Sequence, residues 1–154
     1  MTTAPLTIKK ITSEEDLNSS FAIRRKVFIE EQKVPESEEY DNWDDLNSNC
    51  EHFLLLLSEL PIGTGRLRFP NQEGKIERIA ILKEYRNKNY GAKLIGFLLK
   101  LLKEREISSV YLNSQTSALG FYEKFGFTKE GPEFLDAGIP HYKMTLNLSS
   151  SDPT

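Results

Sequence analysis

The sequence predicts a single α/β domain with a central mixed, mostly antiparallel sheet of six or seven strands and helices on both faces. Short apolar and alternating runs between residues 52 and 82 are typical of strands joined in hairpins. A wide apolar stripe over residues 94–102 is typical of an amphipathic helix. Further strand and helix patterns alternate through residues 110–148, as expected when helices pack onto a sheet.

The chain length limits the number of domains. With 154 residues the chain can bury one core of ordinary size, so we expect one domain over residues 7–148. Residues 149–154 contain only Ser, Asp, Pro and Thr and offer nothing to bury. We expect them to form a flexible tail.

The first elements are a strand and a long helix. Thr7–Ile11 predicts the strand, and Ser13 can then cap a helix that runs to about Gln32. Residues 33–49 are acidic and rich in turn-forming residues, which indicates a long loop or a short irregular helix.

A three-stranded meander follows. His52–Ser58 is a nearly continuous apolar run and Gly63–Phe69 alternates, so the two predict a hairpin with its turn at Pro61. A second turn at Asn71–Gly74 leads into a third strand at Lys75–Leu82. We therefore expect antiparallel pairing at the centre of the sheet.

The second half begins with the amphipathic helix at residues 94–102 and a strand at Val110–Asn113. A further helix is predicted from apolar residues at helical spacing between Ala118 and Phe125. Gly126 stands where a helix end favours a left-handed residue. Strands at residues 127–130 and 141–148 close the sheet.

Composition excludes several classes of function. A net charge of -3 argues against nucleic acid as the main partner, and no segment approaches the length of a membrane span. The one cysteine, Cys50, allows no intrachain disulfide, and Cys50-Glu51-His52 lacks the further ligands of a zinc site, so we expect no metal. The first residues do not resemble a signal peptide, and we expect a cytoplasmic protein.

Residues 86–92, Arg-Asn-Lys-Asn-Tyr-Gly-Ala, stand between a strand and the longest helix. The unpaired backbone N–H groups of a helix N-terminus favour an anion. Gly91 allows a phosphate to approach the backbone, and Asn89 tolerates a positive φ. The pattern alone also fits an ordinary basic loop.

The segment resembles the pyrophosphate-binding motif of the GNAT N-acetyltransferases, Arg/Gln-x-x-Gly-x-Gly/Ala. Arg86 takes the first position, Gly91 takes the second Gly position, and Asn89 departs from the motif at the first. Four other segments of this chain also resemble GNAT motifs, and these motifs occur in the same order in the family. They are Arg25–Gln32, Glu77–Ile81, Ala118–Phe127 and Ala137–His141.

The resemblance implies the GNAT fold, with a V-shaped opening for acetyl-CoA between the fourth and fifth strands. It implies acetyl transfer to a primary amine by direct attack, with acetyl-CoA as co-substrate. The residues that it places against the cofactor are Ile79, Ala80, Ile81, Arg86, Asn87, Lys88, Asn89, Tyr90, Gly91, Ala92, Asn113 and Tyr122.

Two residues are candidates for catalysis. By resemblance, Tyr122 would donate a proton to the departing sulfur, whereas its spacing with Phe121 and Phe125 also fits a core aromatic. Glu77 alternates with Ile79 and Ile81 on a strand, so burial beside aliphatic groups would raise its pKa and make it a base. A solvent contact on an edge strand, or an ion pair with Arg66 or Arg68, is the equal alternative for Glu77.

The acceptor is an amine of a small molecule or of a peptide. The acidic residues 33–49 would attract a cationic amine if they wall the acceptor site, or would form a solvated acidic loop. A different class of function is a non-catalytic module that senses CoA or binds a protein. The sequence leaves the oligomeric state open, with a homodimer among the options.

Overall fold

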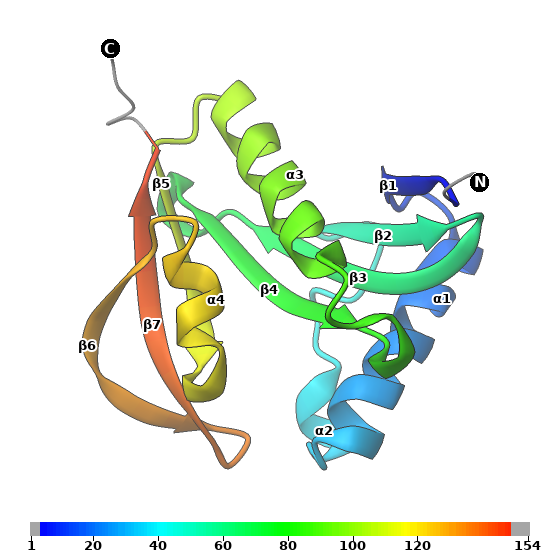
Figure 1. The fold of residues 1–154 in the computed structure, drawn as a ribbon, viewed down its shortest axis with the longest axis horizontal. Coiled ribbons are helices and arrows are strands. Elements are labelled where there is room, and N and C mark those ends of the chain that lie inside the picture. The colour runs from blue at the N-terminus through cyan, green and yellow to red at the C-terminus, as the bar shows by residue number, and fades with distance from the viewer. Residues whose placement is uncertain (1–3, 149–154) are drawn as a thin grey trace.

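The computed structural model describes residues 4–148, which form one seven-stranded sheet with the order β1-β2-β3-β4-β5-β7-β6. The strands are β1 (Leu6–Lys10), β2 (Glu51–Leu57), β3 (Leu60–Arg68), β4 (Gly74–Ile81), β5 (Ser109–Gln115), β6 (Thr128–Asp136) and β7 (Ile139–Asn147). Neighbouring strands are antiparallel except β4 and β5, which are parallel. The predicted fold class is confirmed (Figure 1).

Helices cover both faces of the sheet. They are α1 (Glu14–Arg24), the π-helix η1 (Arg25–Glu31), α2 (Glu36–Glu39), α3 (Tyr90–Glu104) and α4 (Leu119–Glu123), with short 3-10 turns η2 (Pro70–Gln72), η3 (Lys83–Tyr85) and η4 (Thr116–Ala118). The predicted first helix is confirmed, and the Ser13 hydroxyl caps it by accepting from the Asp16 N–H at 3.2 Å. None of the described helices has the length and apolar character needed to cross a membrane.

Each face of the sheet has its own apolar core. On one face α3 buries Leu94, Ile95, Leu98 and Leu102 against the sheet, and the aromatic residues of α4 pack beside them. On the other face Leu17, Ile23 and Val27 of α1 and η1 pack against β2 and β4. Figure 1 shows α3 and α4 on the side opposite to α1. The apolar stripe predicted over residues 94–102 is therefore confirmed.

The sheet divides between β4 and β5. Only three residue pairs join these strands, from Gly74 with Val110 to Ile76 with Leu112. Beyond them the strands part, as Figure 1 shows. The register of β4 against β3 also shifts between the pairs Glu77–Arg66 and Ala80–Thr64, and Arg78 adopts a φ of 55°. This is a β-bulge, which bends the strand and alters which side chains share a face.

Some sequence-based boundaries were wrong. The β2–β3 turn lies at Ser58 and Glu59, both with positive φ, and Pro61 belongs to β3. The strand predicted at residues 127–130 continues to Asp136, and the regular part of the helix predicted from Ala118 ends at Glu123. Gly126 has a φ of 98°, as predicted. The tail predicted at 149–154 lies outside the described residues.

A network of buried charges joins the acidic segment to the sheet. Arg24 is 1% exposed and binds both Glu39 and Asp44, at 2.9 and 2.6 Å. Arg66, 2% exposed, binds Asp41, Asp44 and Glu77. The arginines hold the pKa of Asp44 down at about 2, although burial alone would raise it. Residues 39–44 are thus held under the sheet by ion pairs.

We expect Arg24→Met to lower the free energy of unfolding by about 3–5 kcal/mol, because buried Glu39 and Asp44 lose a cation. Urea unfolding measures this change. Arg105→Gln removes an exposed ion pair with Glu51 and is the control, with an expected loss of about 1 kcal/mol or less. Equal losses in the two variants would contradict a structural role for the buried network.

Candidate active site

A cavity of about 570 Å³ lies where β4 and β5 part. Its walls come from η1, α2, β4, the loop before α3, the end of β5, α4 and the β6–β7 turn. This volume is in the range of ordinary ligand pockets. The opening predicted between the fourth and fifth strands is therefore present.

The structure brings the predicted cofactor residues together at this cavity. Of the twelve, all but Lys88 line it: Ile79, Ala80, Ile81, Arg86, Asn87, Asn89, Tyr90, Gly91, Ala92, Asn113 and Tyr122. Glu77 lines it as well. These residues come from two strands, a loop and two helices.

The start of α3 is built to receive an anion. Asn89 is the N-cap residue with a φ of 66°, and no side chain caps the helix. Asn87 is also left-handed, with a φ of 64°. The first N–H groups of this 15-residue helix are therefore open to a ligand that carries negative charge.

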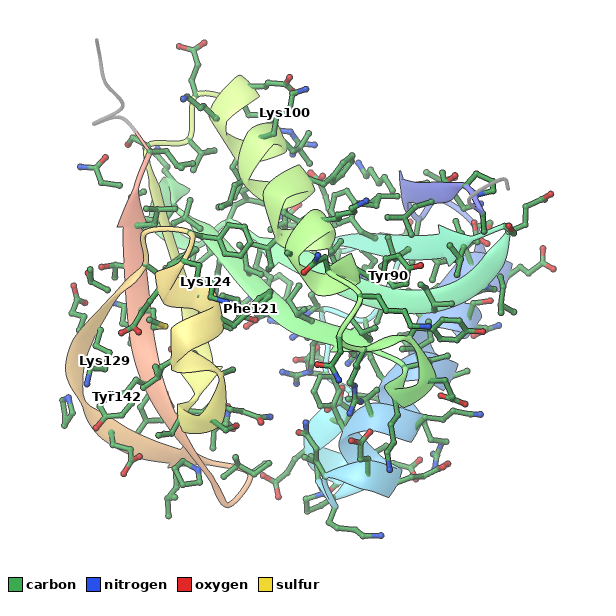
Figure 2. The ribbon with its side chains drawn as sticks, viewed as in Figure 1. Tyr90, Lys100, Phe121, Lys124, Lys129 and Tyr142 are labelled. Atoms are coloured by element: carbon green, nitrogen blue, oxygen red, sulfur yellow. The ribbon has the colours of Figure 1, made fainter. Side chains whose placement is uncertain are left out.

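Packing does not explain the glycine at position 91. A Cβ atom there would meet Phe121 at 3.6 Å and Ile81 at 3.7 Å, which are ordinary contacts. Phe121 of α4 thus lies against the first turn of α3. Figure 2 labels Phe121 beside α4 and Tyr90 at the start of α3. Since glycine weakens a helix and no neighbour requires it, Gly91 fits a position that a ligand approaches closely.

Arg86 has a structural role in this loop. Its terminal nitrogens donate to both carboxylate oxygens of Glu31 at 2.5 and 2.7 Å, and its Nε donates to the Ile81 carbonyl at 2.9 Å. The paired carboxylate raises the pKa of Arg86 and lowers that of Glu31. Arg86 therefore ties the end of η1 to the loop before α3.

Within residues 4–148, the edge of β4 that faces the cavity has no strand partner beyond Ile76. Pairing with β5 ends at Ile76, so residues 77–81 have β3 on one side and the cavity on the other. Backbone N–H and C=O groups along such an edge can pair with an extended ligand as an added strand would.

Tyr122 packs among aromatic residues and also lines the cavity. Its ring is edge-on to those of Phe121 and Phe127, with ring centroids 4.9 and 6.0 Å away. Burial raises the pKa of the phenol to about 12. The hydroxyl therefore stays protonated at neutral pH and can donate a proton.

The prediction that Glu77 shares a face of β4 with Ile79 and Ile81 is wrong. The bulge at Arg78 breaks the alternation: Ile79 and Ile81 pack over Gly65 and Gly63, whereas Glu77 binds Arg66 at 3.0 Å on the other face. Arg68 and Lys75 bind it too, at 3.3 and 2.8 Å. Burial favours a higher pKa, but the three cations outweigh it and lower the pKa of Glu77. The alternative of an ion pair with Arg66 and Arg68 is confirmed.

The two histidines and the cysteine of the chain differ in their position relative to the cavity. His141 lines the cavity, and its Nδ1 lies 2.7 Å from the Ile139 carbonyl. His52 lies outside the cavity, and burial lowers its pKa. Cys50 is also outside, and burial raises its pKa to about 12, so its thiol is inert.

Sequence analysis missed two parts of the cavity. The amide of Gln115 at the end of β5 donates to Gln32 after η1 at 2.7 Å, which joins the two walls. Their separation of 83 positions hides this contact from any local pattern. Arg78 also lines the cavity, because the bulge presents it there.

Comparisons with known proteins agree with this geometry. The family model for the acetyltransferase (GNAT) domain matches residues 12–148. The chain belongs to the GNAT acetyltransferase family. It is 46% identical to a Bacillus subtilis (strain 168) protein named as a candidate acetyltransferase, over 95% of this chain and 99% of that protein. Membership places the protein among the acyltransferases.

Solved GNAT-fold structures resemble this one closely. A Lactobacillus plantarum protein superposes with a TM-score of 0.85 at 26% identity, covering 93% of this chain and 98% of its own. An N-acetyltransferase of Thermoplasma acidophilum, solved in complex with coenzyme A, has a TM-score of 0.72 at 21% identity, with 93% and 99% covered. The resemblance to GNAT N-acetyltransferases is thereby confirmed.

We expect Glu77→Gln to destabilise the GNAT domain at pH 7, by roughly 3–5 kcal/mol, because buried Arg66 loses an anion. The folded-state pKa of Glu77 is lowered, so its contribution is present above the unfolded pKa near 4.3 and is lost as pH falls through the folded value. Urea unfolding at pH 7 and at pH 3 should therefore show a smaller difference between variant and wild type at pH 3. A difference that grows on acidification would contradict this.

Proposed function

We propose that this GNAT protein transfers an acetyl group from acetyl-CoA to a primary amine by direct attack. One observation carries the proposal: a single cavity joins an uncapped helix N-terminus to an unpaired strand edge. The first feature suits a pyrophosphate, and the second suits the extended pantetheine arm.

The residues that line the cavity could contact both the pyrophosphate and the pantetheine arm of the cofactor. The pyrophosphate would accept hydrogen bonds from the N–H groups of Tyr90, Gly91 and Ala92. The arm would follow β4 from Ile81 toward Glu77, with Asn113 of β5 on the opposite side. The coenzyme A bound in the Thermoplasma acidophilum protein supports a CoA-type donor for this fold.

Amine attack needs a stabilised oxyanion and a protonated leaving group. The backbone N–H groups of Ile79 and Ile81 on the open stretch of β4 are the proposed donors to the oxyanion. Tyr122 would give its proton to the thiolate as the tetrahedral intermediate collapses and the carbon–sulfur bond breaks. Its raised pKa keeps the phenol protonated at neutral pH and also makes it a weaker acid than an ordinary tyrosine.

The amine must lose a proton before or during attack. Glu77 is ionised and lines the cavity, so it can accept a proton, but its lowered pKa makes it a weak base. Its role as general base stays a prediction. Buried Cys50 lies outside the cavity, which supports direct attack over an acylated cysteine. A reaction that uses acetyl-CoA also fits the cytoplasm.

We expect Gly91→Ala to weaken acetyl-CoA binding at least tenfold while the helix becomes slightly more stable. The new methyl group causes no clash in the free protein but occupies the place where the phosphate approaches. Thermal unfolding with and without acetyl-CoA measures both effects, since saturation at 100 times the Kd adds about 2.7 kcal/mol.

Gly96→Ala is the matched control. It lies in the same helix, and a Cβ there would meet nothing within 4 Å. This variant should gain a similar amount of stability and bind acetyl-CoA as the wild type does. Unchanged affinity in Gly91→Ala would place the pyrophosphate elsewhere.

We expect Tyr122→Phe to slow acetyl transfer by about 100-fold to 10,000-fold if protonation of the thiolate limits the rate. The ring packing against Phe121 and Phe127 is retained, so melting temperature and cofactor affinity should hardly change. Single-turnover release of free thiol measures the chemical step. An unchanged rate at equal affinity would leave Tyr122 as a packing residue. A wild-type protein that binds acetyl-CoA but transfers no acetyl group would instead favour the non-catalytic CoA-binding alternative.

A further inference from the structure

The charge network beside the cavity is unbalanced. Among the described residues it joins five cations, Arg24, Arg66, Arg68, Lys75 and Arg78, to four carboxylates, Glu39, Asp41, Asp44 and Glu77. One positive charge is therefore in excess. Arginines bind the buried members of the acidic segment, whereas Glu38 of this segment lines the cavity and is exposed.

Among the described residues, Arg78 is the arginine of this network that lines the cavity. Its Nε and Nη2 contact Glu39, donating to the carbonyl at 3.3 and 3.0 Å, and Nε lies 3.2 Å from the carboxylate. Asp41 is farther away, at 3.8 Å from Nη2. Among the described residues the other terminal nitrogen, Nη1, has no partner. Arg78 lines the cavity, and its side chain is 24% exposed.

The other two cations at the cavity are already paired. Arg86 uses both terminal nitrogens on Glu31 and its Nε on a carbonyl. Lys75 binds Glu77 at 2.8 Å. In the described part of the chain, Arg78 is therefore the arginine or lysine at the cavity with a side-chain nitrogen that has no hydrogen-bond partner, although Lys75 and Arg86 also keep spare N–H groups.

We propose that Arg78 binds a carboxylate of the acceptor, so that the substrate is an amino acid or a similar amine that carries an acid group. This inference rests on the proposed acetyl transfer. A guanidinium that is partly desolvated and held by a second charge favours a carboxylate, which it can bind through two N–H groups.

The rest of the acceptor wall suits the same class of molecule. Val27, Phe28 and Val34 line the cavity from η1 and the segment that leads into α2, where Glu39 contacts Arg78. They offer an apolar surface to the side chain of an amino acid. Glu38 and Asp136 also line the cavity but are exposed at its rim, where solvent weakens their hold on a cation. They would attract the ammonium group of the same zwitterion.

Matched acceptors test the proposal. We would compare L-leucine, L-leucinamide and 3-methylbutylamine, which share an apolar body and an amine but differ in the carboxylate, and repeat the comparison with the methionine series. Free thiol released from acetyl-CoA gives kcat/KM. Thermal unfolding with CoA present gives binding of the same compounds without turnover.

Arg78→Asn is the informative variant, because asparagine tolerates the φ of 55° at this position. In the wild type we expect the amino acid to exceed both analogues at least tenfold in kcat/KM and in affinity. The variant should lose this preference, so that the amino acid and the two analogues give similar values of kcat/KM. Arg105→Asn removes an arginine far from the cavity and should keep the preference.

Each result has a defined meaning. Acetylation of the uncharged analogues or of diamines as efficiently as of the amino acids would overturn the carboxylate site and leave acetyl transfer intact. Failure of the protein to bind acetyl-CoA would instead contradict the proposed function, and binding of the three compounds would still decide the carboxylate site. If Arg78→Asn does not fold, the preference of the wild type among the three acceptors alone supports or overturns the carboxylate site.

Discussion

The short pairing of β4 with β5 is the constraint on which the rest of this structure depends. Three residue pairs hold the two halves of the sheet together, and the strands then part. Different helices cover the two faces of the sheet, and the gap between the strands becomes a cavity. The start of α3 lines this cavity from one face, and η1 lines it from the other. The bulge at Arg78 then decides which side chains face the gap.

Backbone groups dominate one wall of the cavity, and charged side chains dominate the other. On the wall that we assign to the cofactor, the main features are backbone groups: the first N–H groups of α3 and the open edge of β4. On the opposite side, side-chain charges dominate, with Arg24 and Arg66 buried among carboxylates. The π-helix η1 connects the walls, through Glu31 to Arg86 and through Gln32 to Gln115. Such helices are frequent at functional sites.

Sequence patterns predicted the fold class and the order of the strands along the chain, because these depend on local features. Helical periodicity over residues 94–102 and left-handed Asn89 are examples. The resemblance to GNAT motifs predicted most of the residues in the wall that we assign to the cofactor. The wall that we assign to the acceptor could not be predicted, since it depends on contacts such as Gln32 with Gln115 and on a bulge that no periodicity shows. The wrong prediction for Glu77 has this cause. Strict alternation would place Glu77 on the same face as Ile79, but the extra residue of the bulge places it on the other face, beside arginines.

The contrast between backbone and side-chain walls has an evolutionary consequence. A wall made of main-chain groups tolerates many side chains, so its sequence can drift while donor binding persists. A wall made of interlocked charges resists single substitutions, because removing Arg66 or Asp44 exposes the buried partners of each to a desolvation cost. New acceptor preferences should therefore arise through Arg78, the member of the network at the cavity with a nitrogen left unpaired among the described residues, before they arise through the buried members.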